Sequence, residues 1–162
     1  MVSIRSGIGE CMEDRYLFKA KHFGEWHIGN IIKEPDGLYI RDIKENVTAY
    51  IDDESTICQC TGLKDKNGNL IWENDIIKDK HGNFYKAFWQ DNYYQFFWIC
   101  VKSDIFSIGA KWDLWSFKSF EIEVIGNIFD NKELLEVRDS MTEKNIKNQA
   151  HVAVANTRKV QT

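Results

Sequence analysis

Turn-forming residues punctuate this chain so often that only short strands fit between them. The clearest example is "CTGLKDKNGNLIWENDII", residues 60–77. Within it, Asn67-Gly68 stands between apolar runs, and this dipeptide favours a two-residue type I′ hairpin turn with positive φ at both positions. Asn74 and Gly82 mark two further tight turns. Turn signals at intervals of about eight to twelve residues are typical of a small β-barrel or sandwich.

The segments between the turns have the composition of strands. Tyr16, Phe18 and Ala20 alternate with lysines, which predicts a half-buried strand. A short helix is expected at 130–137, capped by Asp130 or Asn131. No internal repeat is apparent. Further strands are expected at 26–32, 38–43, 47–51, 56–60, 70–72, 76–89 (as a hairpin), 93–101 and 120–129.

The chain of 162 residues is expected to hold one domain with irregular ends. Residues 1–11 show little pattern and are predicted to be a disordered leader, and residues 12–139 are predicted to form the β domain. The polar tail, residues 140–162, is predicted to be flexible or helical. It is basic, because four basic residues oppose one acidic residue in it.

The net charge of −4 leaves −7 for residues 1–139 once the tail's +3 is set aside. An acidic body argues against nucleic-acid binding, which needs basic surface. No apolar run reaches the ~18 residues of a membrane helix, and the first residues do not form a signal peptide. A cytoplasmic location is therefore predicted, in which the four cysteines, Cys11, Cys58, Cys60 and Cys100, are expected to be free thiols.

Several residues invite a chemical role, but their contexts favour a structural one. Asp65, Glu73 and Asp75 could act as acid and base, yet they lie in or beside turns, where such side chains bond their own backbone. Cys58 and Cys60 lack the second ligand pair that a zinc site needs. No phosphate-binding loop is present. The sequence therefore predicts no catalytic, metal-binding or cofactor-binding residue.

Nine aromatic residues crowd residues 84–98 and give the strands there two apolar faces. Single-stranded nucleic acid stacks on such rings, but only Lys86 and Asp91 carry charge in this window. A strand that is apolar on both faces is buried on both. Self-association is therefore predicted, with one large core as the rival explanation. The candidate interface residues are Trp89, Tyr93, Tyr94, Phe96 and Trp98.

Three separated motifs carry a resemblance to a known family. "TGLKDKNGNLIWENDII" is similar to the signature of the YopX family of phage and prophage proteins, in which a Gly usually occupies the position of Asn74. "FKAK…GEWHIGNII" and "EVIGNIFDNKELLE" resemble its N-terminal and C-terminal segments. The resemblance covers about residues 12–137. Because Asn is the best non-glycine residue at positive φ, the turn at Asn74 is expected to be kept.

The resemblance implies a β-rich fold of phage or prophage origin. Residues 12–57 would supply hairpin strands, and residues 58–139 a barrel of the SH3 type with a short C-terminal helix. It implies no enzyme activity and no cofactor. The expected role is contact with phage or host proteins or self-assembly into a homo-oligomer, without a membrane. The alternative is a nucleic-acid-binding regulatory module, and a hydrolase using the turn carboxylates ranks last.

Overall fold

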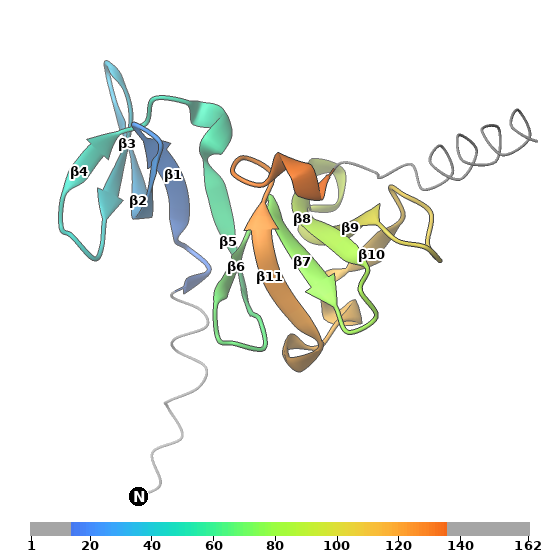
Figure 1. Ribbon diagram of the computed structural model, residues 1–162. Helices are drawn as coiled ribbons and strands as arrows, with labels where there is room; N and C mark the ends of the chain where they lie inside the picture. Colours follow the sequence, from blue (N-terminus) through green and yellow to red (C-terminus); the bar gives the residue numbers. More distant parts are fainter. Residues whose placement is uncertain (1–13, 136–162) are drawn as a thin grey trace, which may run out of the picture.

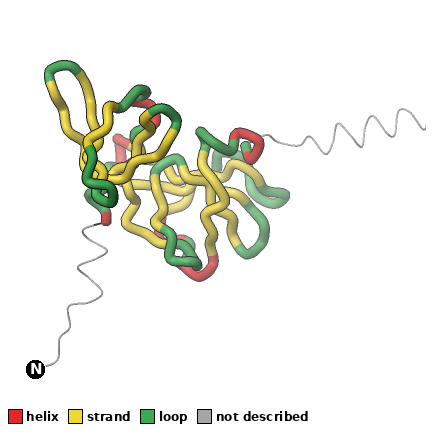
Figure 2. The backbone as a smooth tube through the Cα atoms, turned by 60° about the vertical axis from the view of Figure 1, so that its left-hand side comes forward, coloured by secondary structure: helices red, strands yellow, loops and turns green. Residues whose placement is uncertain are grey.

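The computed structural model describes residues 14–135, so the predicted leader and tail lie outside the described residues. This part is mainly β, with two antiparallel sheets and only 3₁₀ turns in place of long helices (Figures 1 and 2). The strands are β1 (Phe18–His22), β2 (Glu25–Glu34), β3 (Gly37–Asp42), β4 (Thr48–Tyr50), β5 (Cys58–Lys64), β6 (Leu70–Trp72), β7 (Asp75–Asp79), β8 (Phe84–Gln90), β9 (Gln95–Lys102), β10 (Lys111–Asp113) and β11 (Ile122–Asn127).

The first sheet has six strands in the order β4-β3-β2-β1-β5-β6. Its core is small and aliphatic, formed by Ala20, Ile40, Ala49 and Ile51. β2 and β3 approach closely at Gly29, where a Cβ atom would lie 1.7 Å from the carbonyl oxygen of Arg41. Only glycine allows this approach.

The second sheet has five strands in the order β10-β9-β8-β7-β11. Side chains alternate between its two faces. One face forms the largest core of the described residues, and the connection between β10 and β11 contributes Leu114 and Phe117 to it. The buried members of this core are Ile71, Ile77, Tyr85, Ala87, Trp98, Cys100 and Ile122.

A closed SH3-like barrel spanning 58–139 is not seen, because β5 and β6 belong to the first sheet. β5 pairs with β1 through Lys19 and Cys58, a contact between distant segments that local patterns do not reveal. The β5–β6 turn still reaches the second sheet. The backbone N–H of Lys66 donates to Ile122 O at 3.0 Å, and that of Val124 to Asp65 Oδ2 at 3.0 Å.

The expected C-terminal helix is reduced to one 3₁₀ turn, Lys132–Leu134, within the described residues. Asn131 precedes it without a side-chain capping bond. Its amide oxygen instead accepts from the backbone N–H of Asn127 at 3.2 Å. The Asn131 side chain, which was expected to cap a longer helix, therefore holds the end of β11 instead.

The Asn67-Gly68 turn has positive φ at Gly68 (84°) but not at Asn67, so the two-residue type I′ turn was the wrong turn type. The side chain of Asp65 accepts from the backbone N–H groups of Asn67 and Asn69, both at 2.9 Å. These bonds extend the loop by one residue and leave a single left-handed position. Asn74 and Gly82 have φ of 65° and 88°, in the left-handed region.

No helix in the described part of the chain is long and apolar enough to span a membrane. Cys58 and Cys100 are buried free cysteines, and Cys60 is buried as well.

Candidate functional site

The turn carboxylates are occupied by hydrogen bonds. Asp65 and Asp79 each begin the pentapeptide D-K-x-G-N, at residues 65–69 and 79–83. In both turns Oδ1 accepts from the backbone N–H of the third and fifth residues, and Oδ2 from the side chain of the fifth. Burial raises the pKa of both carboxyls, but these bonds outweigh it and lower the pKa. The sequence analysis did not identify this repeat, whose carboxylates hold the backbone of the two turns.

Asp75 lies in the interior, where β1 meets the start of β7. Its Oδ1 lies 2.5 Å from Lys19 Nζ, and the two side chains are 4% and 9% exposed. Burial raises the pKa of Asp75, while Lys19 opposes the shift. The ammonium group also lies over the rings of Trp26 and Trp72, at 4.8 and 5.8 Å from their centroids. This polar contact joins the two sheets.

Asp130, which follows β11 of the second sheet, forms a second contact with the first sheet. It pairs with Lys21 of β1, and its Oδ2 accepts from the Trp26 indole N–H at 2.7 Å. Partial burial opposes ionisation, but the bonds from Lys21, Trp26 and Asn127 lower the pKa of Asp130 to about 2. Phe129 packs against Trp26 with ring centroids 5.7 Å apart. The residues after β11 therefore hold the first hairpin in place.

No group of three His, Cys, Asp or Glu side chains in residues 14–135 is placed to hold a metal ion. Cys58 is buried, and burial raises its pKa to about 11, which disfavours the reactive thiolate. Glu73 accepts from the backbone N–H of Trp89 at 3.4 Å. The three carboxylates first considered as acid and base thus each have their own partners, although Glu73 and Asp75 flank the same turn.

The five candidate interface residues fall into three groups. Phe96 and Trp98 are 4% and 0% exposed, because their strand position points them into the core. Trp89 is half-buried against Phe96. Tyr93 and Tyr94 are 64% and 82% exposed, at the turn between β8 and β9. Only these two tyrosines are free to meet a partner, and the interface itself stays a prediction.

The opposite face of the second sheet brings together lysines and aromatic rings from four strands. The strand register sets them in three rows, because alternate residues share a face and a register shift on β9 brings Lys102 into the first row. We call this surface the lysine–aromatic face. Its rows are Lys78, Phe84 and Lys102; Ile76, Lys86, Ile99 and Lys111; and Phe88, Phe97 and Asp113. Ile76 is fully buried, so the surface is open over the other positions.

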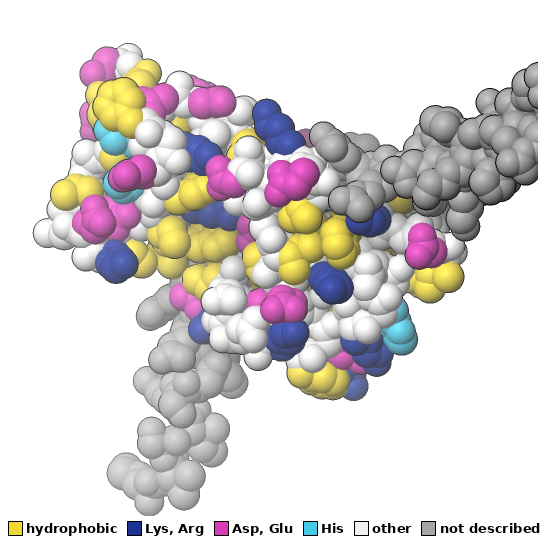
Figure 3. Space-filling model, viewed as in Figure 1, with side chains coloured by type: hydrophobic (Ala, Val, Ile, Leu, Met, Phe, Trp, Pro, Cys, Tyr) yellow, Lys and Arg dark blue, Asp and Glu magenta, His cyan; other side chains and the backbone are white. Residues whose placement is uncertain are grey.

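Two lysines of this face extend over its rings. Lys102 Nζ lies 4.9 Å from the centroid of Phe84, and Lys111 Nζ lies 5.1 Å from that of Phe88. Phe88 and Phe97 pack with centroids 6.1 Å apart. All three phenylalanine rings are half-buried. Hydrophobic and basic side chains also lie next to one another over β7 and β11 in Figure 3.

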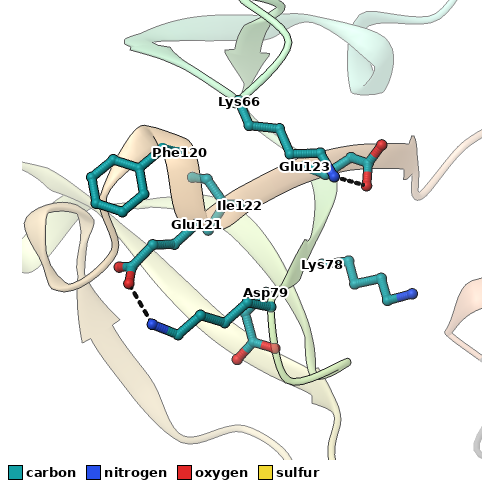
Figure 4. A pocket seen from close by; sticks show the side chains of 8 residues that line it. Lys66, Lys78, Asp79, Phe120, Glu121, Ile122 and Glu123 are labelled. Atoms are coloured by element: carbon teal, nitrogen blue, oxygen red, sulfur yellow. Dashed lines mark hydrogen bonds and ion pairs between the residues drawn. The ribbon is translucent and has the colours of Figure 1, made fainter.

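A hollow of about 260 Å³ continues this face beyond Lys78 (Figure 4). Lys80 pairs with Glu121 at 2.6 Å across it. Lys66 meets Glu123 at 2.7 Å, whereas Lys78 extends away from both acids. Among the described residues Lys78 has no ion-pair partner. The exposed ring of Phe120 borders the hollow, so aromatic and basic groups continue to the end of the sheet.

Sequence reasoning missed this face because it examined residues 84–98 alone. That window holds Lys86. Lys78 and Lys111 lie in strands outside the window, and Lys102 lies at the end of β9, beyond residue 98. Pairing of β7, β8, β9 and β10 places them on one surface. The strand period of two sets Lys78, Lys86 and Lys111 at outward positions, whereas Lys102 joins them only through the register shift at the end of the β8–β9 pairing, which the sequence does not reveal.

Two antiparallel sheets joined by a polar contact define a small mainly-β protein. The family model described as YopX protein matches residues 23–136. The chain therefore belongs to the YopX family, as its three motifs predicted. No curated protein matches the chain.

Proposed function

We propose that this protein binds single-stranded nucleic acid on the lysine–aromatic face. The observation that carries the proposal is the strand register, which sets Lys78, Lys86, Lys102 and Lys111 among three phenylalanines. The acids Asp113 and Glu123 on this face have partners, since Asp113 accepts from Gln95 and Glu123 from Lys66. Glu121, in the adjoining hollow, pairs with Lys80. The acidic character of the whole chain thus does not extend to this surface.

The chemistry suits an unpaired strand better than a duplex. Unstacked bases expose their faces and can stack on phenylalanine rings, while phosphates pair with lysine. Lys102 and Lys111 already lie over Phe84 and Phe88, so a base could take the place of each ammonium group over a ring. The displaced lysines would then be free for the phosphates. This favours what was the alternative role, nucleic-acid binding, over protein contacts.

Replacing Lys86 and Lys111 together with Gln is expected to weaken binding of a single-stranded oligonucleotide. Each phosphate contact releases counterions when the strand binds. Losing two contacts should therefore reduce the magnitude of the slope of log K against log[salt] by about 1.4, or ~0.7 per lysine. Fluorescence anisotropy with labelled oligothymidylate and oligouridylate over a salt series measures this slope.

The matched control is the double variant Lys33→Gln/Lys44→Gln, which removes two exposed lysines, one in β2 and one in the β3–β4 turn. It should leave the slope unchanged. Phe88→Leu tests stacking separately, because it should lower affinity without changing the slope. No saturable binding at low salt, or equal losses in both lysine pairs, would rule out this function.

Self-association is a second candidate, and one observation favours it. Tyr94 is 82% exposed and has a φ of 52°, a left-handed conformation that is costly for a bulky residue. Strain at an exposed aromatic residue is typical of functional contacts. The exposed Tyr93 precedes it. Sedimentation of the wild type against Tyr94→Lys tests whether these tyrosines join two copies.

Replacing Tyr94 with Gly is expected to raise the free energy of unfolding by about 0.5–1 kcal/mol. Relief of the left-handed strain is worth ~1–2 kcal/mol, and the greater freedom of glycine in the unfolded chain offsets part of it. Urea denaturation measures the change. A loss of stability would mean that the exposed ring makes contacts that hold the β8–β9 turn.

The remaining parts of the proposal rest on the family resemblance. We propose a protein of phage or prophage origin that acts in the cytoplasm of a bacterial host, without enzymatic activity and without a cofactor. The saturated turn carboxylates support the non-enzymatic reading, because their lone pairs already serve the backbone. Assay of the purified protein for hydrolysis of the oligonucleotides used above tests it.

A further inference from the structure

A separate hollow of about 250 Å³ lies where the two sheets meet. β5 supplies Leu63 to one wall, and β9 supplies Phe96 to the other. Leu114, Trp115 and Phe117 complete it from the connection between β10 and β11. Phe96 and Phe97 are neighbours in one strand and point to opposite faces, so this hollow is distinct from the lysine–aromatic face.

The lining differs in kind from that of the hollow beside Lys78, which six charged residues surround. Here the walls are mostly apolar, and Arg15 is the only charged residue among those that line the hollow. Arg15 makes no ion pair within the described residues. Its side chain lies against Gly62, where an added Cβ would be 3.4 Å from Arg15 Cβ. Because Arg15 is exposed and makes no ion pair with another described residue, its guanidinium is available to an anion.

Trp115 is left in water at the rim of this hollow. It is 76% exposed, whereas its neighbours Leu114 and Phe117 are half-buried against the core. Large exposed apolar side chains beside a concave apolar surface mark binding sites. Trp and Arg are also the residues that contribute most at protein interfaces.

We infer that this hollow binds a peptide segment of a protein partner that carries an aromatic side chain next to a carboxylate. The volume is below the ~300–1,000 Å³ of pockets for whole cofactors and suits one large side chain. Arg15 supplies the single positive charge, which selects an acidic neighbour. The apolar walls and Trp115 receive the ring. This site is independent of the proposed nucleic-acid surface.

Two peptides that differ in one group test the inference: Ac-Gly-Phe-Asp-Gly-NH₂ and its Asn counterpart. The indole N–H resonance of Trp115, assigned with Trp115→Phe, should shift and saturate at millimolar concentrations of the Asp peptide. The Asn peptide should bind about threefold to fivefold more weakly, the share expected of one solvent-accessible ion pair.

Arg15→Gln should make the two peptides bind equally, and Trp115→Ala should abolish the binding of both. Phe120→Ala removes an exposed ring elsewhere and should change neither affinity. Arg15→Gln should also leave oligonucleotide binding unchanged, which separates this site from the lysine–aromatic face. Equal affinity of the two peptides for the wild type, no shift at Trp115 up to about 10 mM, or tighter binding of N-acetyl-phenylalanine than of either peptide would overturn the inference.

Discussion

Replacing Lys19 with Met is expected to lower the free energy of unfolding by about 3–5 kcal/mol, because it leaves the Asp75 carboxylate buried without its cation. The pair is 2.5 Å apart, and neither side chain is more than 9% exposed. Met retains apolar contact with the rings of Trp26 and Trp72, so the charge is the main loss. Urea denaturation at neutral pH measures the effect.

The double variant Lys19→Met/Asp75→Asn is the control for this loss. Asn keeps an oxygen for the backbone N–H of Trp72, which donates to Asp75 Oδ2 at 2.9 Å. With no buried charge left, the double variant should recover most of the stability. Lys33→Met, at an exposed position of β2, should cost less than about 0.5 kcal/mol. A Lys19→Met loss no larger than that would show that the pair does not hold the sheets together.

Lowering the pH should restore part of the stability that Lys19→Met removes. Burial raises the pKa of Asp75, and Lys19 is what opposes this shift. A carboxyl with a raised folded-state pKa stabilises the fold below its unfolded pKa, and this contribution is lost as pH rises through the folded pKa. The gap between wild type and Lys19→Met should therefore narrow as pH falls from about 7 toward about 4.

The local part of the fold could be predicted from the sequence, because turns and strand periodicity depend on neighbouring residues. Gly68, Asn74 and Gly82 mark turns by their own conformational preferences, and the alternation around Phe18 marks a strand. The type of the Asn67-Gly68 turn was missed because Asp65, two residues before it, redirects the backbone. The second D-K-x-G-N turn could have shown this, since it repeats the same side-chain pattern.

The long-range part could not be predicted. Membership of β5 in the first sheet depends on pairing with β1, and Lys19 meets Asp75 across 56 residues. The charge of the lysine–aromatic face likewise follows only once β7, β8, β9 and β10 are paired. Composition gave the acidic average of the chain, which conceals a basic surface on one sheet. The burial of Phe96 and Trp98 follows from the same register, which sets Phe97 outward.

Replacing Asp79 with Asn is expected to lower the free energy of unfolding by about 2–3 kcal/mol. Oδ1 of Asp79 accepts from two backbone N–H groups, and an Asn oxygen could still do so. Oδ2 accepts from Asn83 Nδ2 at 2.8 Å and from Tyr85 OH at 3.1 Å, and an amide nitrogen there would face two donors. Asp53→Asn, at an exposed cap with one backbone bond, is the control and should change stability little.

The Asp79→Asn variant should also lose less stability than the wild type as the pH falls. Burial alone would raise the pKa of Asp79, but the bonds from Asn83, His81 and Tyr85 lower it overall. A carboxyl with a lowered folded-state pKa stabilises above its unfolded value of about 3.9, and this contribution is lost as pH falls through the folded pKa. Asp42 and Asp65 shift in the same direction. The wild type should therefore lose stability steeply below about pH 4, and Asp79→Asn less steeply because one of these groups is absent. Parallel acid curves for the two proteins would show that the charge of Asp79 contributes nothing to the turn.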